Sequence, residues 1–378
     1  MYVKSKSRCL ISLFVRIKRC GPKYTNATRM HFFIVRKILK EFIDKVRMAK
    51  CLISVILTSG TRKEYINHAL DSLINQNLPR DLFEVIIVKA YNDKDIDNII
   101  EANSFINITT MANKTIGEDI LEGLGIAKGE IICFMDDDDL FREMKLSSVI
   151  NYFNYHPNLG AIYDSSDFYN DLTSEISNGV VVKENSFFDL SSENEFKEFA
   201  SKNLFWNLSR LSIKKSLALT SVEFLPFLLG HTDDFFFYLL ADLRAEVVVL
   251  SNRLTLYRHR QNAHPVIFEK FIAIIQDTSR KHKASSLIIE TLVKTRWLKE
   301  YAHSDFNSME CIEALFLIPS ISKTLVLILS LSKHLFSGYK TRGRVILLLG
   351  LLASLALRSS TPHIIYSYLV GRKYPGII

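Results

Sequence analysis

The stretch AKGEIICFMDDDDL, residues 127–140, decides the fold prediction. Its middle, Ile131–Met135, is a short apolar run, and four consecutive aspartates, Asp136–Asp139, follow it directly. An apolar run of this length that ends at polar residues predicts a buried strand entering a loop. The stretch therefore places a dense acidic cluster at the end of a strand.

Four adjacent carboxylates repel one another unless a partner neutralises them. Mn²⁺ or Mg²⁺ suits such a cluster, because these cations take oxygen ligands and need few from the protein when phosphates supply the rest. We therefore predict a metal held by Asp136 and Asp138, or by Asp138 and Asp139. The alternatives are a solvated acidic loop and a helix cap formed by Asp139.

Upstream of this stretch, apolar runs alternate with segments of helical periodicity. The apolar runs lie at residues 52–57, 83–88 and 106–111, and the helical segments at 63–75, 94–102 and 117–127. This alternation predicts an α/β fold with a Rossmann-like, mostly parallel sheet and helices on both faces. Ligands bind at the carboxyl ends of such strands, so functional residues are expected directly after Leu57, Val88 and Met135.

The downstream pattern continues the same domain to about residue 265. It predicts a helix at 142–155, a strand at 159–163, a loop-rich excursion at 164–205 with an antiparallel strand or two, and then strand, helix and strand at 206–213, 233–242 and 247–258. The predicted catalytic domain spans residues 51–265, and residues 266–378 are predicted to be a helical, apolar C-terminal region.

Both ends of the chain suggest a membrane. Residues 1–50 hold fourteen Lys and Arg against two acidic residues, whereas the whole 378-residue chain has a net charge of +8. This extension could lie on an anionic membrane surface, bind nucleic acid, or be an over-extended start that precedes Met48. The apolar runs at 315–336 and 345–357 are too short or interrupted for confident spans, and fit interfacial helices, a shallow hairpin or a buried helix pair. We expect a membrane-associated protein on the cytoplasmic side, peripheral or monotopic, with a cytoplasmic protein as the alternative and no nucleic-acid partner.

Composition excludes two other classes of protein. A hydrophobic content of 48% is incompatible with a disordered chain. The five cysteines, Cys9, Cys20, Cys51, Cys133 and Cys311, are scattered and lack CxxC spacing, which argues against a disulfide framework or a zinc site. Cys51 and Cys133 are expected to be small core residues in a reducing environment.

Several pieces of the chain, in order, resemble family 2 glycosyltransferases with the GT-A fold. The matching pieces are Ser54–Leu57, Ala69–Gln76, Glu84–Val88 and the AKGE-strand-DDDD stretch quoted above. The resemblance implies a GT-A type fold and inverting transfer of a sugar from a nucleotide-diphosphate sugar to an acceptor hydroxyl. It also implies that the metal acts as a Lewis acid on the diphosphate. With the apolar tail, it suggests a lipid-linked glycan, polysaccharide or glycolipid acceptor.

The resemblance also assigns roles near the second half of the domain. Thr232-Asp233-Asp234 stands where the family carries its general base, so Asp234 would be the base and Asp233 its neighbour. The alternative is an ordinary acidic helix cap. The element at residues 256–262 implies that His259 is a metal or phosphate ligand and that Arg258 and Arg260 bind phosphate.

The nucleotide side departs from the family pattern. The second strand ends in Lys89-Ala90-Tyr91-Asn92-Asp93, where the family places aspartates that hold the nucleotide. Lys89 could bind phosphate, Tyr91 could stack on a base, and Asp93 could replace the missing carboxylate. The candidate nucleotide-sugar-binding residues are Thr58, Lys89, Tyr91, Asp93, Gly117, Asp136 and Asp137. A catalytically inactive module that binds glycans or organises partners at a membrane, and a nucleotidyltransferase, are the rival interpretations.

Overall fold

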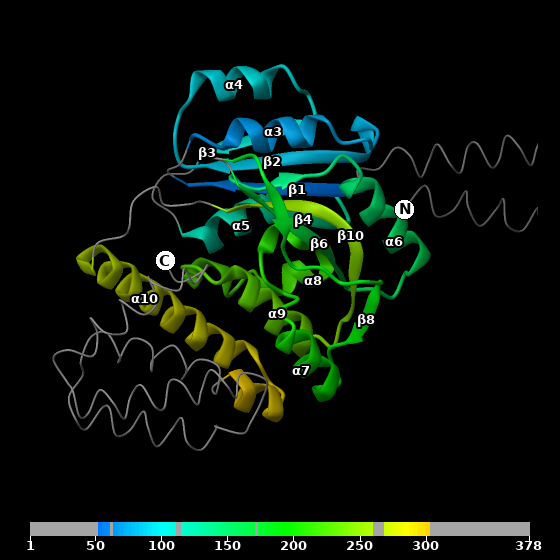
Figure 1. Cartoon of the computed structure of the whole chain (residues 1–378), viewed down its shortest axis with the longest axis vertical. Coiled ribbons are helices and arrows are strands. Elements are labelled where there is room, and N and C mark those ends of the chain that lie inside the picture. The colour runs from blue at the N-terminus through cyan, green and yellow to red at the C-terminus, as the bar shows by residue number, and fades with distance from the viewer. Residues whose placement is uncertain (1–51, 61–62, 111–114, 171–172, 260–267, 303–378) are drawn as a thin grey trace, which may run out of the picture. The chain divides into compact units, whose positions relative to one another are not determined.

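The computed structural model describes residues 52–60, 63–110, 115–170, 173–259 and 268–302. By its contacts the chain divides into residues 1–50 and residues 51–378, and every described residue belongs to the second unit. Figure 1 shows these residues as a curled sheet with helices on both sides.

A single mixed sheet organises the described residues. Its strands follow the order β3-β2-β1-β4-β9-β6-β10-β5, with β7 paired to β6 and β8 to β10. Each antiparallel pair in this sheet involves β5, β7, β8 or β9, and the other pairs are parallel. The strands are β1 (Ile53–Ser59), β2 (Phe83–Lys89), β3 (Ile106–Thr110), β4 (Ile131–Asp136), β5 (Leu140–Phe141), β6 (Ala161–Asn170), β7 (Ile176–Asn178), β8 (Ser186–Asp189), β9 (Leu211–Lys214) and β10 (Glu246–His259).

Side chains alternate along each strand, so apolar residues lie on both faces of the sheet, and helices cover both faces. Val55 and Leu57 of β1 face one buried cluster, while Ile56 faces the other. The first cluster includes residues of α3 (Ile66–Ile74), α4 (Lys94–Glu101) and α6 (Lys145–Tyr155). The second includes residues of α5 (Ile116–Ile126), α7 (Glu193–Ser201), α9 (Thr232–Asp242) and α10 (Phe268–Leu292). The two groups lie on opposite sides of the sheet in Figure 1.

The register brings three strand ends together. Ser59 of β1 pairs with Lys89 of β2, and Thr58 pairs with Asp136 of β4. Because these strands are parallel, their carboxyl ends meet at one edge of the sheet. This edge is where a fold of this kind places its ligand.

The AKGE stretch, residues 127–130, forms hydrogen bonds at the amino ends of the strands, opposite the edge where a ligand is expected. The Ser54 hydroxyl donates to Glu84 Oε1 at 2.7 Å, and the backbone N–H of Gly129 donates to Ser54 Oγ at 2.8 Å. Glu84 also accepts from the backbone N–H of Lys128 at 2.6 Å. A Cβ on Gly129 would lie 2.4 Å from the backbone nitrogen of Ser54, so only glycine fits this approach. These residues join the amino ends of β1, β2 and β4.

The predicted α/β fold is confirmed, with three local corrections. β6 extends to Asn170, whereas the prediction ended it at Tyr163, because its polar second half pairs with β7 and β10. Helix α7 was not predicted within 164–205, although Ser192 caps it and Phe196, Phe199 and Ala200 are buried at helical spacing. The predicted strand at 206–213 is instead the short 3-10 helix η2 (Leu208–Arg210) followed by β9.

The predicted C-terminal helices are seen only in part. α10 and a further helical turn at 296–302 follow the sheet, as expected beyond Pro265. No helix among the described residues is long and apolar enough to cross a membrane. The runs at 315–336 and 345–357, the extension at 1–50, Cys51 and Arg260 lie outside the described residues. Cys133 is a free, buried thiol, as predicted.

Candidate active site

The four aspartates at the end of β4, Asp136–Asp139, form a stretch that we call the aspartate loop, and its side chains point in two directions. Asp137 points towards the ends of β1 and β2, where its Oδ2 accepts from the Ser59 hydroxyl at 2.8 Å. Ser59 Oγ also lies 2.9 Å from the Tyr91 hydroxyl. Burial raises the pKa of Tyr91, with a smaller contribution from the nearby charge of Asp137, so Tyr91 stays a neutral phenol. This chain of polar groups defines the β1/β2 side of the site.

Asp139 points to the other side of the loop. Its side chain is fully buried, Oδ2 accepts from Asn207 Nδ2 at 2.9 Å, and Oδ1 accepts from the backbone N–H of Arg258 at 3.2 Å. Burial raises the pKa of this carboxyl, while the hydrogen bonds from Ser209, Asn207 and Arg258 oppose the shift. Asp139 thus ties the loop to η2 and β10.

Arg258 fastens the loop rather than projecting from it. Its guanidinium is buried, donates from Nε to the backbone carbonyl of Asp138 at 2.8 Å, and lies 4.6 Å from the ring centroid of Tyr65. The ring of Tyr169 lies on it as well, at 5.3 Å. Its η nitrogen is 3.3 Å from His68 Nδ1. The predicted phosphate ligand is therefore enclosed by protein groups in this structure.

Asn207 connects the aspartate loop to the start of α9. Its side chain bonds Asp139, and its backbone N–H donates to Asp233 Oδ2 at 3.3 Å. Its own Oδ1 accepts from the backbone N–H of Ser209 at 2.7 Å. The backbone φ of Asn207 is 71°, a conformation that asparagine adopts more readily than most side chains. One buried residue thus brings two acidic elements of the prediction together.

The two candidate base carboxylates have different surroundings. Burial and the negative charge of Asp234 raise the pKa of Asp233 to about 6. Asp234 lies 3.3 Å from His231 Nδ1 and has a side chain 23% exposed, so it is accessible to a ligand. Hydrogen bonding and the charge of Asp234 raise the pKa of His231 in spite of its burial. The contact thus holds His231 against the Asp234 carboxylate at the start of α9.

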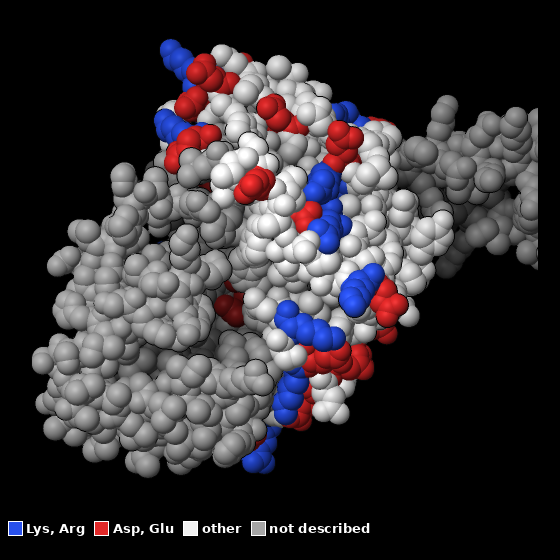
Figure 2. All heavy atoms as spheres, in the orientation of Figure 1, with Lys and Arg blue, Asp and Glu red and all other residues white. Residues whose placement is uncertain are grey.

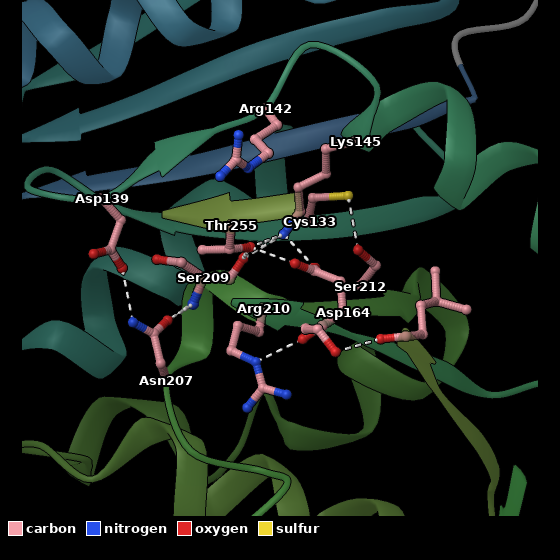
Figure 3. A network of polar contacts seen from close by, with 12 residues as sticks. Cys133, Asp139, Arg142, Lys145, Asp164, Asn207, Ser209, Arg210, Ser212 and Thr255 are labelled. Carbon is pink, nitrogen blue, oxygen red and sulfur yellow. Dashed lines mark hydrogen bonds and ion pairs between the residues drawn. The ribbon is translucent and has the colours of Figure 1, made fainter. Parts of the chain in front are cut away.

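A buried polar network lies beneath the loop, as Figure 3 shows. Lys145 Nζ, at the start of α6, contacts Asp164 Oδ1 at 2.6 Å, the Ser209 carbonyl at 2.6 Å and Thr255 Oγ1 at 2.7 Å. The Lys145 side chain is 0% exposed and that of Asp164 is 1% exposed. Since Ser209 Oγ accepts from the backbone N–H of Asp136 at 3.0 Å, this network supports the loop from below.

Of the predicted metal ligands, Asp136 and Asp138 have the spacing that the prediction used for a divalent cation. Asp139 is buried and hydrogen-bonded to Asn207 and Arg258, and Asp137 accepts from Ser59. Among the described residues no three His, Cys, Asp or Glu side chains converge as a metal cage. Two carboxylates suffice for Mg²⁺ or Mn²⁺ only when substrate phosphates complete the shell. The side chain of His259 is not among those described.

The remaining predicted nucleotide-side residues have structural partners. Lys89 is 1% exposed and its ammonium lies 2.6 Å from Asp97 Oδ1. Asp93 caps α4 through the backbone N–H groups of residues 95 and 96, and Lys63 lies 3.7 Å from it. Thr58 is buried in β1. Gly117 packs so closely that a Cβ would meet the Leu225 carbonyl oxygen at 1.9 Å. Within this set, Tyr91 is linked to Asp137 through the Ser59 hydroxyl, and Thr58 pairs with Asp136 in the sheet.

Sequence reasoning missed Asn207, Ser209 and Lys145. Their long-range contacts join residues 19 to 110 positions apart, which a single sequence does not reveal. A weak signal existed, because a lysine in an otherwise apolar helix face must find a partner when it is buried.

Comparison with known proteins agrees with this geometry. Residues 54–204 match the model of the family described as Glycosyl transferase family 2. An uncharacterized glycosyltransferase of Haemophilus influenzae is 30% identical over 115 residues, which cover 30% of this chain and 38% of that protein. The Poly(ribitol-phosphate) beta-glucosyltransferase of Bacillus spizizenii is 29% identical over 93 residues, covering 23% of this chain and 15% of that protein. The match thus spans less than two fifths of these relatives.

The fold has a solved counterpart of similar extent. The crystal structure of S. aureus TarS 1–349 in complex with UDP-GlcNAc has a TM-score of 0.55 at 16% identity, covering 81% of this chain and 91% of that chain. Together, the curled sheet and this solved counterpart show a fold of the GT-A type. Residues 54–204, about two fifths of the chain, are similar in sequence to glycosyl transferase family 2.

Proposed function

We propose that the protein transfers a sugar from a nucleotide-diphosphate sugar to the hydroxyl of a glycan acceptor, with inversion at the anomeric carbon. The observation that carries the proposal is the meeting, through Asn207, of the aspartate loop at Asp139 with the acidic start of α9 at Asp233. A donor-binding loop and a base must lie close together for one displacement at one carbon.

Each side of the site has its own task. Asp136 and Asp138 would hold Mn²⁺ or Mg²⁺ on the diphosphate, and the cation supplies charge stabilisation to the leaving group. Asp234 takes the proton of the acceptor hydroxyl, because it is accessible and His231 orients it. Asp233 holds the start of α9 against Asn207. Tyr91 and Ser59, on the β1/β2 side, contact the nucleotide.

The names of two relatives and the sequence support the proposed acceptor and location. One relative is named as a Poly(ribitol-phosphate) beta-glucosyltransferase and another as the Minor teichoic acid biosynthesis protein GgaB, and both names refer to polymers. A lipid-linked or polymeric surface glycan is therefore the acceptor class we infer. The basic residues 1–50 and the apolar runs near the C-terminus support work at the cytoplasmic membrane surface.

Nucleic acid is not part of this proposal. Figure 2 shows basic and acidic side chains interspersed over the described part of one face. A protein that follows a phosphate backbone gathers its lysines and arginines on one surface.

A donor screen tests the proposal. The full chain, purified in mild detergent, is incubated with UDP-, GDP- and dTDP-sugars and Mn²⁺, and free nucleotide diphosphate is measured. We expect hydrolysis of one donor class, and loss of at least 100-fold in Asp138→Asn but not in Asp71→Asn, an exposed aspartate of α3. Absence of both turnover and metal-dependent nucleotide binding would favour a non-catalytic, glycan-binding module.

A further inference from the structure

Three aromatic side chains gather on the side of the aspartate loop away from β1 and β2. Phe168 of β6, Trp206 before η2 and Tyr257 of β10 have ring centroids 4.6 to 5.9 Å apart. All three are partly exposed. The larger aromatic cluster of α7 and α9, including Phe196, Phe199 and Phe237, is by contrast buried in the core. The partly exposed cluster is therefore not explained by core packing alone.

Chain connectivity places this cluster beside the reacting groups. Trp206 directly precedes Asn207, which bonds both Asp139 and Asp233. Tyr257 directly precedes Arg258, whose backbone N–H bonds Asp139. Trp206 and Tyr257 are thus each adjacent in sequence to a residue that bonds Asp139.

The strand order separates this cluster from the nucleotide side. Ser59 and Tyr91 lie at the ends of β1 and β2, whereas Phe168 and Tyr257 are register partners on β6 and β10. β4, with the aspartate loop, lies between these pairs of strands in the sheet order. A donor that contacts Tyr91 and the aspartates would present its sugar towards the aromatic cluster.

We propose that Phe168, Trp206 and Tyr257 form the acceptor subsite, and that the acceptor group bound there is a pyranose ring. This inference rests on the proposed function. Aromatic faces pack against the C–H face of a pyranose, while Trp N–H and Tyr O–H bond its hydroxyls. A bare polyol phosphate would instead need cations. On this side Arg142 and Arg253 already pair with Asp167, at 2.9 and 2.7 Å.

The reaction at this subsite balances simply. The acceptor hydroxyl oxygen forms a bond to the anomeric carbon of the donor sugar. The bond from that carbon to the diphosphate oxygen breaks, its electron pair leaves with the nucleoside diphosphate, and the hydroxyl proton passes to the Asp234 carboxylate.

Fluorescence tests ligand contact without turnover. The chain holds two tryptophans, Trp206 and Trp297, and Trp297 lies against Phe196 with ring centroids 5.3 Å apart. In Trp297→Phe the emission comes from Trp206 alone. We expect a saturable change in Trp206 emission with octyl β-glucopyranoside, octyl β-galactopyranoside or octyl N-acetyl-β-glucosaminide, each used below its micelle concentration. We expect no change in this emission with ribitol 5-phosphate or octanol. A response to ribitol 5-phosphate alone, or to none of these probes, overturns the pyranose subsite.

Kinetics tests the consequence for transfer. With the donor found by the screen, we expect Trp206→Ala to lower the ratio of transfer onto the octyl glycoside to donor hydrolysis at least tenfold. Trp206→Phe should restore part of that ratio, and Trp297→Phe should leave it unchanged. If the ratio is unaltered in Trp206→Ala and in Tyr257→Ala, the subsite is wrong. If the wild type hydrolyses no donor while glycosides still alter Trp206 emission, the proposed function fails and the sugar site stands.

Discussion

Replacing Asp233 by asparagine is expected to stabilise the folded protein at pH 8 and to leave its stability unchanged near pH 4. Burial and the charge of Asp234 raise the pKa of Asp233 from 3.8 to about 6. A carboxyl with a raised folded pKa binds its proton more tightly in the folded state. Its protonation therefore stabilises the protein below about pH 4, and this contribution is lost as the pH rises through 6.

The magnitude follows from the size of the shift. A rise of about 2 units corresponds to about 3 kcal/mol of unfavourable free energy for the ionised side chain in the folded protein at pH 8. Asparagine has nearly the same shape, carries no charge, and offers an oxygen to the backbone N–H of Asn207. Asp233→Asn should therefore gain up to about 3 kcal/mol at pH 8.

Urea unfolding at pH 4.5, 6 and 8, in EDTA, measures this difference. The gain of the variant should grow with pH, and the same variant should transfer sugar more slowly than the wild type. Asp95→Asn, an exposed aspartate of α4, is the matched control and should show no such trend. A variant that is less stable than the wild type at pH 8 would refute the argument, because it would mean that the ionised carboxylate is stabilised by its surroundings.

Three further changes test the frame of the site. Gly129→Ala places a Cβ 2.4 Å from a backbone nitrogen of β1, so urea unfolding should show a loss of about 1–3 kcal/mol or more; equal stability would show that the approach can relax. Lys145→Met strands the buried Asp164 carboxylate and should cost about 3–5 kcal/mol, whereas Lys145→Met with Asp164→Leu should recover much of this loss in the same assay. Asn207→Ala removes the side-chain bond to Asp139 and should lower transfer about 10–100-fold in the donor assay; an unchanged rate would mean that the bridge has no catalytic role.

The sheet could be predicted from the sequence because several of its strands contain short apolar runs that are visible in the local sequence. The centres of β1, β2 and β4, Val55–Leu57, Val85–Val88 and Ile131–Met135, are continuous apolar runs, as is typical of strands covered on both faces. The polar half of β6 escaped prediction because its stability comes from pairing with distant β10 and β7, which local composition does not express. Helix α7 was missed although its cap and apolar spacing were readable.

The sequence predicts which segments form the site, but it does not predict the contacts between them. The aspartate loop and the start of α9 both appear as acidic clusters in the sequence, and the structure joins them through Asn207. Nothing local marks Asn207 as the connection, since its partners lie 26 and 68 positions away. Lys89 is the opposite case. Its place at a strand end predicts a phosphate contact, but in the structure its ammonium pairs with Asp97.

The hydrogen bonds among Ser54, Glu84 and Gly129 bear on how such proteins diversify. They lie near the amino ends of their strands, about 17 Å along β1 from Ser59 at the reacting edge. The family match at 54–204 also ends before Trp206, Asn207 and the α9 aspartates. These hydrogen bonds and the proposed acceptor subsite therefore lie in separate parts of the molecule, so the subsite can be altered while the hydrogen bonds that join the strands stay intact.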